Sequence, residues 1–497
     1  MAVAILVVVV VPRPSVADDR LLADKAAAYQ EFFEAYHSPG PGGVVIVRFE
    51  DADFTEPNCY KSLGDSAFFT GLYLGAQAMR YEATGDEDAL AEVRRIAEFM
   101  HQILEVTYTP GYIARYVGPD RMPFNCEALP IEGGSEHEPG ENDYVGSFWL
   151  DDTSRDQYVG WFWGLTRAFD VLRPEEDAAL RERIQDDFRE VLAMFVETDW
   201  RIRDQNGRTR GTAYFIENFR RLSWLLQASH VTGDTEFRDR FDELWAMEKD
   251  SFFADVWAWP NKYVQYYGMN LLHLEFDAML RLWPEGADAQ FVYDTWLAAV
   301  RQYVAGAHNA WFDAVYLGGC ERFGGCPDAD AVADDIVKGL TDFWDAPNWR
   351  RGITASELPL DPFSVWADEW LAEHPLFESL WDIDPQTLQA HEVADRCWDP
   401  FLWHRSPYHT AECDLTERKN RTAPGVDFIL AYWAAVDNGA IGTGDGIADD
   451  DDDDTADDGP SDGDNDDDDD DDSGYEPGDG APMDDEKSDD GDDGCGC

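Results

Sequence analysis

The chain has 497 residues, of which 44% are hydrophobic, so it is long enough to bury a large core. Its 103 acidic residues outnumber 38 basic ones and give a formal net charge of −65. We expect neither nucleic acid nor an anionic membrane surface as a partner, because phosphate binding requires clustered Lys and Arg. A surface rich in Asp and poor in Lys is typical of a protein kept soluble by charge repulsion in saline surroundings.

The first predicted segment is a signal peptide over residues 1–17. An apolar run from Ala2 to Val11 precedes Pro14-Ser15-Val16-Ala17, which supplies the small residues of a secretory cleavage site, although no Lys or Arg precedes the run. About ten apolar residues are too few to span a bilayer as a helix, which needs roughly 20. We therefore expect a secreted or surface-displayed bacterial protein, with the periplasm as the alternative and with attachment to the cell only through its termini.

Two stretches share a design that predicts helical hairpins. Residues 69–86 and 219–234 are each an apolar helix that ends in Thr-Gly-Asp. Gly85 and Gly233 suit the left-handed position after a helix, and the Asp that follows each can cap the next helix. Further turns are predicted at 173–176 and 283–286, an opening helix at 21–36 and a closing helix at 426–436. Together they give about six hairpins, each with an apolar inner helix and an amphipathic outer one.

Repeated hairpins of this length bury their inner faces only by stacking side by side, and closure into a ring protects both ends. We therefore predict an all-α fold, an α/α toroid of about six helical hairpins, over residues 18–438. The inner-helix pattern, with residues 111–116, 152–157 and 426–433, resembles the α/α toroid, six-hairpin glycosidase superfamily, whose familiar members include unsaturated glucuronyl hydrolases. The resemblance implies a hydrolase with a carbohydrate substrate.

Six cysteines fall in the predicted toroid, an even number in a chain with an export signal, which favours disulfide bonds. Spacing makes three pairs the simplest of the 15 possible pairings: Cys59 with Cys126, Cys320 with Cys326, and Cys397 with Cys413. A zinc site is disfavoured because the chain has no Cys-x-x-Cys pair. We expect no metal centre in the toroid.

Residues 439–497 are rich in Asp, Gly, Ser and Pro, and carry 27 acidic residues against a single Lys. Such a segment has too few apolar groups to offset chain entropy, and we expect it to be disordered. Weak Ca²⁺ binding by its carboxylates is one interpretation, but a solubilising spacer is favoured because no calcium-loop register is present. The final Cys495-Gly496-Cys497 resembles part of myxosortase-type sorting tails, without their apolar helix and basic residues. No other cofactor is expected.

Residues 148–165 combine acids and indoles at a helix start, as sugar-cleaving sites do. Asp152 or Ser154 can cap this helix, and Asp156 lies in its first turn. The resemblance implies two aspartates from neighbouring inner helices, and by position Asp65 and Asp152 match that pair, with Asp156 as a substitute. Apolar neighbours would raise the pKa of such an acid toward the range useful for proton donation. The alternative is that the three acids only cap helices.

Other candidate side chains lie near the starts of inner helices or in loops. The substrate-binding candidates are Trp149, Trp161, Tyr214, Asn218, Asn270, His273, His308 and Arg405. Tyr, Asn and His around one cavity also suit a polysaccharide lyase that acts by β-elimination. A structural role between helices is the alternative for Asn270 and His273, and a salt bridge for Arg405. A third class is a surface glycan-binding or scaffold protein that kept the toroid without catalysis.

Overall fold

The computed structural model describes residues 16–61, 63–126, 137–209, 216–258, 266–324, 326–346, 390–396, 401, 403, 406–407 and 420–443. All of them belong to one unit, which ends at Asp445. Most of the predicted signal peptide and nearly all of the acidic tail lie outside the described ranges. So do four residues named in the predictions: Tyr214, Cys397, Arg405 and Cys413. In the described part of the chain, no helix is long and apolar enough to cross a membrane.

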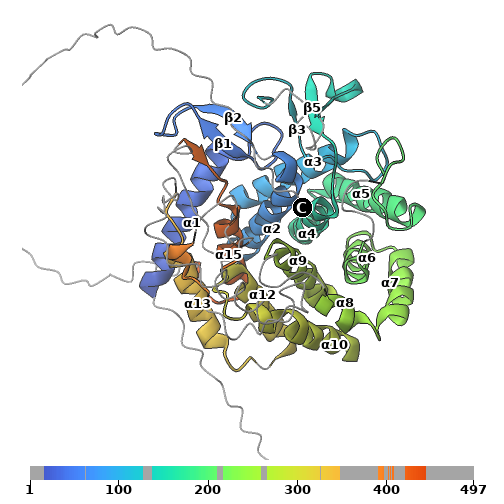
Figure 1. The fold of residues 1–497 in the computed structure, drawn as a ribbon, viewed down its shortest axis with the longest axis vertical. Coiled ribbons are helices and arrows are strands. Elements are labelled where there is room, and N and C mark those ends of the chain that lie inside the picture. Colours follow the sequence, from blue (N-terminus) through green and yellow to red (C-terminus); the bar gives the residue numbers. More distant parts are fainter. Residues whose placement is uncertain are drawn as a thin grey trace, which may run out of the picture. The chain divides into compact units, whose positions relative to one another are not determined.

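In the described part of the chain, six inner helices form a closed ring (Figure 1). They are α2 (Ser66–Thr84), α4 (Arg155–Val171), α6 (Asn218–Thr232), α9 (Tyr266–Leu282), α12 (Ala310–Phe323) and α15 (Val426–Asp437). Each contacts the next in this order, and α15 returns to contact α2. The ring therefore has no free edge, and the predicted α/α toroid is confirmed.

The outer layer alternates with the inner helices along the chain. It consists of α1 (Val16–Tyr36), α3 (Glu87–Glu105), α5 (Ala178–Glu197), α7 (Thr235–Glu248), α10 (Ala287–Trp296) and α13 (Ala329–Asp342). A π-helical turn at Leu297–Arg301 and the short α11 (Gln302–Val304) extend α10. One further helix, α8 (Phe252–Ala258), lies between α7 and α9 in the chain.

Sequence pattern decides which helix lies in which layer. In α2 every residue from Ser66 to Met79 is buried, whereas α3 buries a stripe at helical spacing that includes Leu90, Val93 and Met100. The turn between them follows the prediction: Gly85 has φ 67° and donates to the carbonyl of Tyr81 at 2.7 Å. Apolar inner and amphipathic outer helices therefore follow from local sequence alone.

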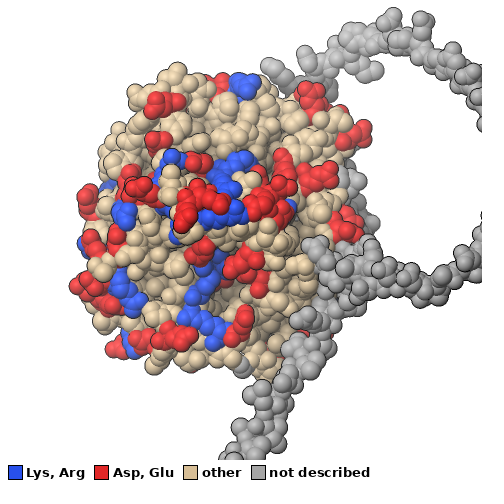
Figure 2. Space-filling model, turned by 180° about the vertical axis from the view of Figure 1, so that it is seen from behind, with Lys and Arg blue, Asp and Glu red and all other residues tan. Residues whose placement is uncertain are grey.

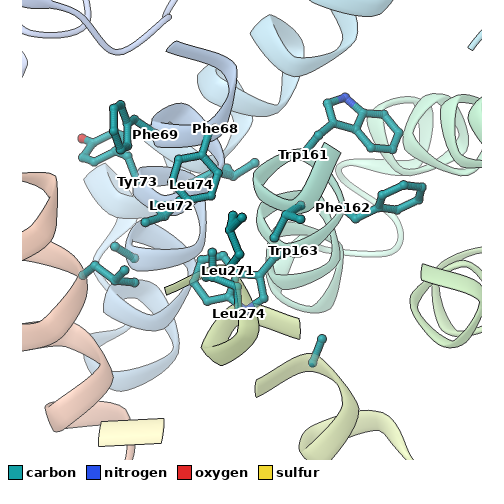
Figure 3. Close-up of a cluster of buried hydrophobic side chains, with 14 of the residues drawn as sticks. Phe68, Phe69, Leu72, Tyr73, Leu74, Trp161, Phe162, Trp163, Leu271 and Leu274 are labelled. Carbon is teal, nitrogen blue, oxygen red and sulfur yellow. The ribbon is translucent and has the colours of Figure 1, made fainter. Parts of the chain in front are cut away.

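Glycines bring α2 and α4 unusually close. A Cβ on Gly164 would lie 2.4 Å from the carbonyl oxygen of Gly71, and one on Gly75 would lie 2.1 Å from the Trp163 ring. In Figure 3, Phe68 of α2, Trp163 of α4 and Leu271 of α9 lie between these three helices, whereas Trp161 and Phe162 point away from them. The inner helices therefore pack on one another through buried apolar side chains in the middle of the ring.

Two small antiparallel sheets precede α2 and α4, which the sequence did not predict because strands this short show no alternation. The first is ordered β2 (Pro57–Lys61), β1 (Ile46–Phe49), β6 (Arg421–Thr422), and the second β3 (Val117–Pro119), β5 (Ser147–Leu150), β4 (His137–Pro139). Disulfides join Cys59 to Cys126 and Cys320 to Cys326, which confirms two of the predicted pairs. The third predicted pair, Cys397 with Cys413, lies outside the described residues.

Candidate active site

The inner helices run parallel because an outer helix returns the chain after each one, so their N-terminal ends gather at one end of the ring. We call this the site end. Helix N-termini present unpaired N–H groups and a positive partial charge, which favour nearby carboxylates. Asp65 directly precedes α2, and Asp156 is the second residue of α4. The close crossing of α2 and α4 holds these two acids on neighbouring helices of the site end.

Asp65 and Asp156 lie within electrostatic reach of each other. Burial raises the pKa of Asp65 above its ordinary value, the Arg115 guanidinium opposes that rise, and the Asp156 carboxylate adds to it. The Asp65 side chain nevertheless keeps 47% of its exposure. Because about half of its side chain is exposed, the Asp65 carboxyl group is open to a ligand from solvent.

Arg115 contacts both segments that carry the acids, the one before α2 and the one before α4. Its Nη1 lies 3.7 Å from Asp65 Oδ1 and donates to the carbonyl of Gly64 at 2.6 Å, while its Nε donates to the carbonyl of Asp152 at 2.6 Å. One rigid guanidinium therefore joins the segment before α2 to the segment before α4. Gln157 adds a second link, because its Oε1 accepts from the backbone N–H of Phe68 at 3.0 Å.

Asp152 has a left-handed backbone conformation, which is uncommon outside glycine, although Asp adopts it more readily than most residues. Its φ of 62° lies in the left-handed region, which is costly for residues other than glycine and is found at functional sites. Its carbonyl serves as the acceptor for Arg115. Ser154 occupies the N-cap position of α4, as one of the two predictions had it, but its side chain makes no capping hydrogen bond.

A buried charge cluster continues from α4 to α6 and α9. Glu217 forms ion pairs with Arg155 and with Arg220, and the Nε of Arg220 lies 3.2 Å from Glu275 Oε1. The indole N–H of Trp224 donates to the same oxygen of Glu275 at 3.1 Å. The Arg220 side chain is fully buried, so its charge is balanced inside the protein rather than by water.

The charge cluster also reaches the acid pair. Burial lowers the pKa of Arg220, but Glu217, Glu275 and Asp156 together raise it above its ordinary value. Burial raises the pKa of Glu275 to about 7, against the opposing effect of Arg220. Charges of alternating sign therefore run from Asp156 at the site end through Arg220 to Glu275 in the middle of α9, and they link α4, α6 and α9.

The two tryptophans predicted to bind substrate are core residues. Trp161 is fully buried, its indole N–H donates to the carbonyl of Met100 at 3.0 Å, and its ring packs against Phe188 of α5. It faces the outer helices rather than the site end, which contradicts the substrate-binding role. Trp149 is buried in the middle of the second sheet, where it pairs with Val117.

Three further candidates lie on α6 and α9. Asn218 is the first residue of α6, and its side chain hydrogen-bonds Asp255 of α8. Asn270 and His273 are buried one and two turns into α9. Burial lowers the pKa of His273 to about 3, and its ring stacks on Phe312 with centroids 3.7 Å apart. His273 is therefore a neutral core residue, in agreement with the structural alternative.

His308 lies at the rim of the site end, two residues before α12. Its φ is 48°, and its Nδ1 lies 2.7 Å from Asp335 Oδ1 on the outer helix α13. The hydrogen bond to Asp335 raises the pKa of His308. His308 thus joins α12 to the outer layer, on the side of the ring opposite α4. Of the three predicted catalytic residues, the structure brings Asp65 and Asp156 together most directly.

Sequence reasoning missed the cations and amides that position the acids. Arg115, Gln157 and Arg220 were not predicted as site residues, because their partners are distant in sequence. Arg115 lies in the segment 111–116 that contributed to the resemblance, and this was its only signal. Among the described residues, no group of three His, Cys, Asp or Glu is arranged to hold a metal ion.

No protein-family model matches the chain, and no curated protein matches it. Solved endoglucanase structures are similar over much of its length. A single mutant of a thermostable endoglucanase from Alicyclobacillus acidocaldarius has 14% identity and a TM-score of 0.42, with 84% of each chain covered. A metagenome-derived glycoside hydrolase family 9 endoglucanase has 14% identity and a TM-score of 0.43, covering 84% of this chain and 81% of that one. At this similarity, the site residues of those enzymes do not transfer to this chain.

Proposed function

We propose that the protein is a glycoside hydrolase in which Asp65 and Asp156 supply the acid and base chemistry. The observation that supports this is the placement of two carboxyl groups within electrostatic reach at the site end, one of them with a raised pKa and an accessible side chain. Cleavage of a glycosidic bond requires such a pair, because one group gives a proton and the other takes one.

Asp65 acts as the general acid in this scheme. Its raised pKa keeps the proton available, and it protonates the glycosidic oxygen as the bond from that oxygen to the sugar carbon breaks. Asp156 assists the incoming water, whose oxygen bonds to the same carbon while its proton passes to a carboxylate. The products are two shorter sugars, and the two carboxyl groups return to their starting states in the catalytic cycle.

The substrate is a carbohydrate chain, and the arginines of the site favour a neutral one. Arg115, Arg155 and Arg220 each already face a carboxylate, so they are poorly suited to bind the carboxyl group of an acidic sugar. The acidic oligosaccharide expected from Arg405 depends on a residue outside the described ranges. Two disulfides fit a protein that works outside the cytoplasm, which supports the proposed export.

The test compares Asp65→Asn and Asp156→Asn with Asp242→Asn, which changes an exposed acid on α7. Turnover is measured on aryl glycosides and on neutral and acidic oligosaccharides. We expect kcat to fall by about 10²–10⁴-fold in each site variant, because proton transfer is lost while the side-chain volume is kept. The Asp242 variant should keep its activity, and thermal denaturation checks that all three proteins fold.

Two outcomes contradict the proposal. Unsaturated products released equally by the parent and both site variants would indicate a lyase. Turnover of none of these substrates by the parent protein would favour a glycan-binding or scaffold protein. Asp152→Asn is measured alongside to decide whether its carboxyl group, as well as its carbonyl, contributes.

A further inference from the structure

The short helix α8 carries exposed aromatic rings on one side. Phe252 and Val256 are buried in the core, whereas Phe253 is 42% exposed and Trp257 is 41% exposed. Residues four apart on a helix lie next to each other, so Phe253 and Trp257 form one apolar face. Aromatic side chains of this size are usually buried, so two neighbouring rings that are each about two-fifths exposed are a candidate contact surface for a small apolar ligand face.

Trp257 is held in a fixed orientation by its polar edge. Its indole N–H donates to the hydroxyl of Tyr303 at 3.0 Å. Tyr303 belongs to α11, at the end of the outer helix that leads toward α12. Because the N–H group is already hydrogen-bonded to Tyr303, the exposed part of Trp257 includes the apolar surface of the ring. A ring fixed in this way loses little conformational entropy when a ligand stacks on it.

The aromatic face lies at the site end. The outer helix α7 returns the chain to that end, and α8 follows it before α9 begins. Asp255 lies on the side of α8 opposite the two exposed rings and is hydrogen-bonded by Asn218, the first residue of α6, so the rings are on the side of α8 turned away from α6. Figure 1 shows α8 beside α6 and α10, in agreement with their contacts. The face is therefore on the rim, on the solvent side of α8 and one helix beyond the acid pair.

The chemistry of this face suits an uncharged, amphipathic partner. Figure 2 shows that basic side chains on one face of the molecule are flanked by acidic ones, and the whole chain is strongly acidic. Anionic ligands are repelled by such a surface. A protein partner needs about 1,200–2,000 Å² of total buried surface. Two rings of about 200 Å² each, less than half exposed, provide far less.

We propose that Phe253 and Trp257, with Tyr303 as support, form an accessory surface that binds a neutral glycan chain extending from the acid pair. The apolar faces of pyranose rings pack on aromatic rings, while their hydroxyl groups stay in water. The identity of the ligand rests on the proposed function, but the surface makes a separate contribution. It should matter for long chains and not for short substrates that occupy only the acid pair.

Binding is measured by affinity electrophoresis in gels containing hydroxyethyl cellulose, neutral arabinoxylan, galactomannan or polygalacturonate. The parent protein carries Asp65→Asn so that it does not cut the polymer. We expect at least one neutral glycan to retard it, and Trp257→Ala or Phe253→Ala to weaken that binding about tenfold, the loss of one stacked ring. Met247→Ala is the matched control, because Met247 is 69% exposed on the neighbouring α7 and lies outside the aromatic face.

Trp257→Phe separates the ring from its hydrogen bond. It removes the donor to Tyr303 but keeps an aromatic face, so we expect it to bind better than Trp257→Ala. Unchanged binding in both Ala variants overturns the inference, as does retardation by polygalacturonate alone or by none of the four polymers.

Failure of this inference and failure of the proposed function are distinguishable. If Asp65→Asn abolishes the turnover of aryl glycosides but Trp257→Ala leaves polymer binding unchanged, the proposed hydrolase is supported and the accessory surface is not. If Trp257→Ala weakens polymer binding but Asp65→Asn and Asp156→Asn leave turnover unchanged, the accessory surface is supported and the catalytic assignment is wrong.

Discussion

Gly71 of α2 and Gly160 of α4 lie back to back where the two helices cross: a Cβ atom placed on Gly71 would be 2.0 Å from the carbonyl oxygen of Gly160. Only hydrogen fits in that gap, so the helix backbones themselves are in contact. The contact lies about two turns below Asp65 and about one turn below Asp156. Because helices are stiff, it determines how far apart the two carboxyl groups are held.

Gly71→Ala should therefore damage both stability and catalysis. The new methyl group meets backbone, which cannot rotate away, and we expect a loss of about 3 kcal/mol in the free energy of unfolding. Gly306→Ala is the control, because no atom lies within 4 Å of its added Cβ and the change should cost less than about 0.5 kcal/mol. Urea denaturation measures both. Equal stability of the two variants would show that α2 and α4 are not in backbone contact.

Arg115→Gln should change the pH profile of turnover. The guanidinium lowers the pKa of Asp65, so its loss raises that pKa further. If Asp65 acts in its protonated form, the alkaline limb of the kcat/KM profile moves to higher pH. Arg115→Lys keeps the positive charge but cannot hydrogen-bond both the Gly64 and the Asp152 carbonyl groups. The alkaline limb of its kcat/KM profile should therefore stay at the same pH, while kcat falls about tenfold. A limb that does not move in Arg115→Gln contradicts the role of Asp65 as the acid.

Glu275→Gln should flatten the dependence of stability on pH. The pKa of Glu275 is about 7 in the folded protein against 4.5 for an ordinary Glu. The folded state therefore holds this proton more tightly than the unfolded state does. The stabilisation is full below about pH 4.5 and is lost as pH rises through about 7. Urea denaturation of the parent at pH 5 and pH 8 should show a loss of roughly 1–3 kcal/mol, which the Gln variant lacks.

Glu275→Leu provides the contrast for this prediction. Gln keeps an oxygen for Arg220 and for the Trp224 indole, whereas Leu leaves the buried guanidinium with one acceptor fewer. Removing one partner of a buried ion pair costs about 3–5 kcal/mol. The Leu variant should thus be clearly less stable than the Gln variant at pH 8. The opposite order would mean that Arg220 does not need Glu275.

The two disulfides should contribute unequally to stability. The bond between Cys59 and Cys126 closes a loop of 67 residues, whereas that between Cys320 and Cys326 closes a loop of 6. Constraint of the unfolded chain predicts about 4 kcal/mol for the longer loop and about 2 kcal/mol for the shorter one. Double Ser variants of each pair, compared by denaturation without reductant, test this order. Equal losses would mean that the entropy of the unfolded chain is not the main effect.

The parts of the fold that depend on neighbours in sequence could be predicted. Gly85 and Gly233 end helices through their own backbone freedom, and burial stripes such as Leu90, Val93 and Met100 follow from helical spacing. Asp65 and Asp152 could be proposed as a pair, with Asp156 as a substitute, because all three lie just before or at the start of an inner helix. Each of these features is set by residues that are close to one another in the sequence.

The parts that depend on contacts between distant segments could not be predicted. Trp161 lies on a helix that is buried on all sides, so spacing does not show whether its ring faces the site end or the outer layer. Arg115 is fixed by the carbonyls of Gly64 and Asp152, and backbone carbonyls look alike in every sequence. The exposure of the aromatic rings on α8 could not be predicted from the sequence either, because aromatic residues are usually found in cores.

The contact between α15 and α2 has a consequence for biosynthesis. One flank of α2 is covered by the last helix of the ring, which the ribosome makes only after all the others. During translation, that apolar side of α2 lacks its native contact with α15 while hundreds of residues are added. A chain truncated before α15 would therefore lack the contact that closes the ring and would leave this apolar flank of α2 exposed.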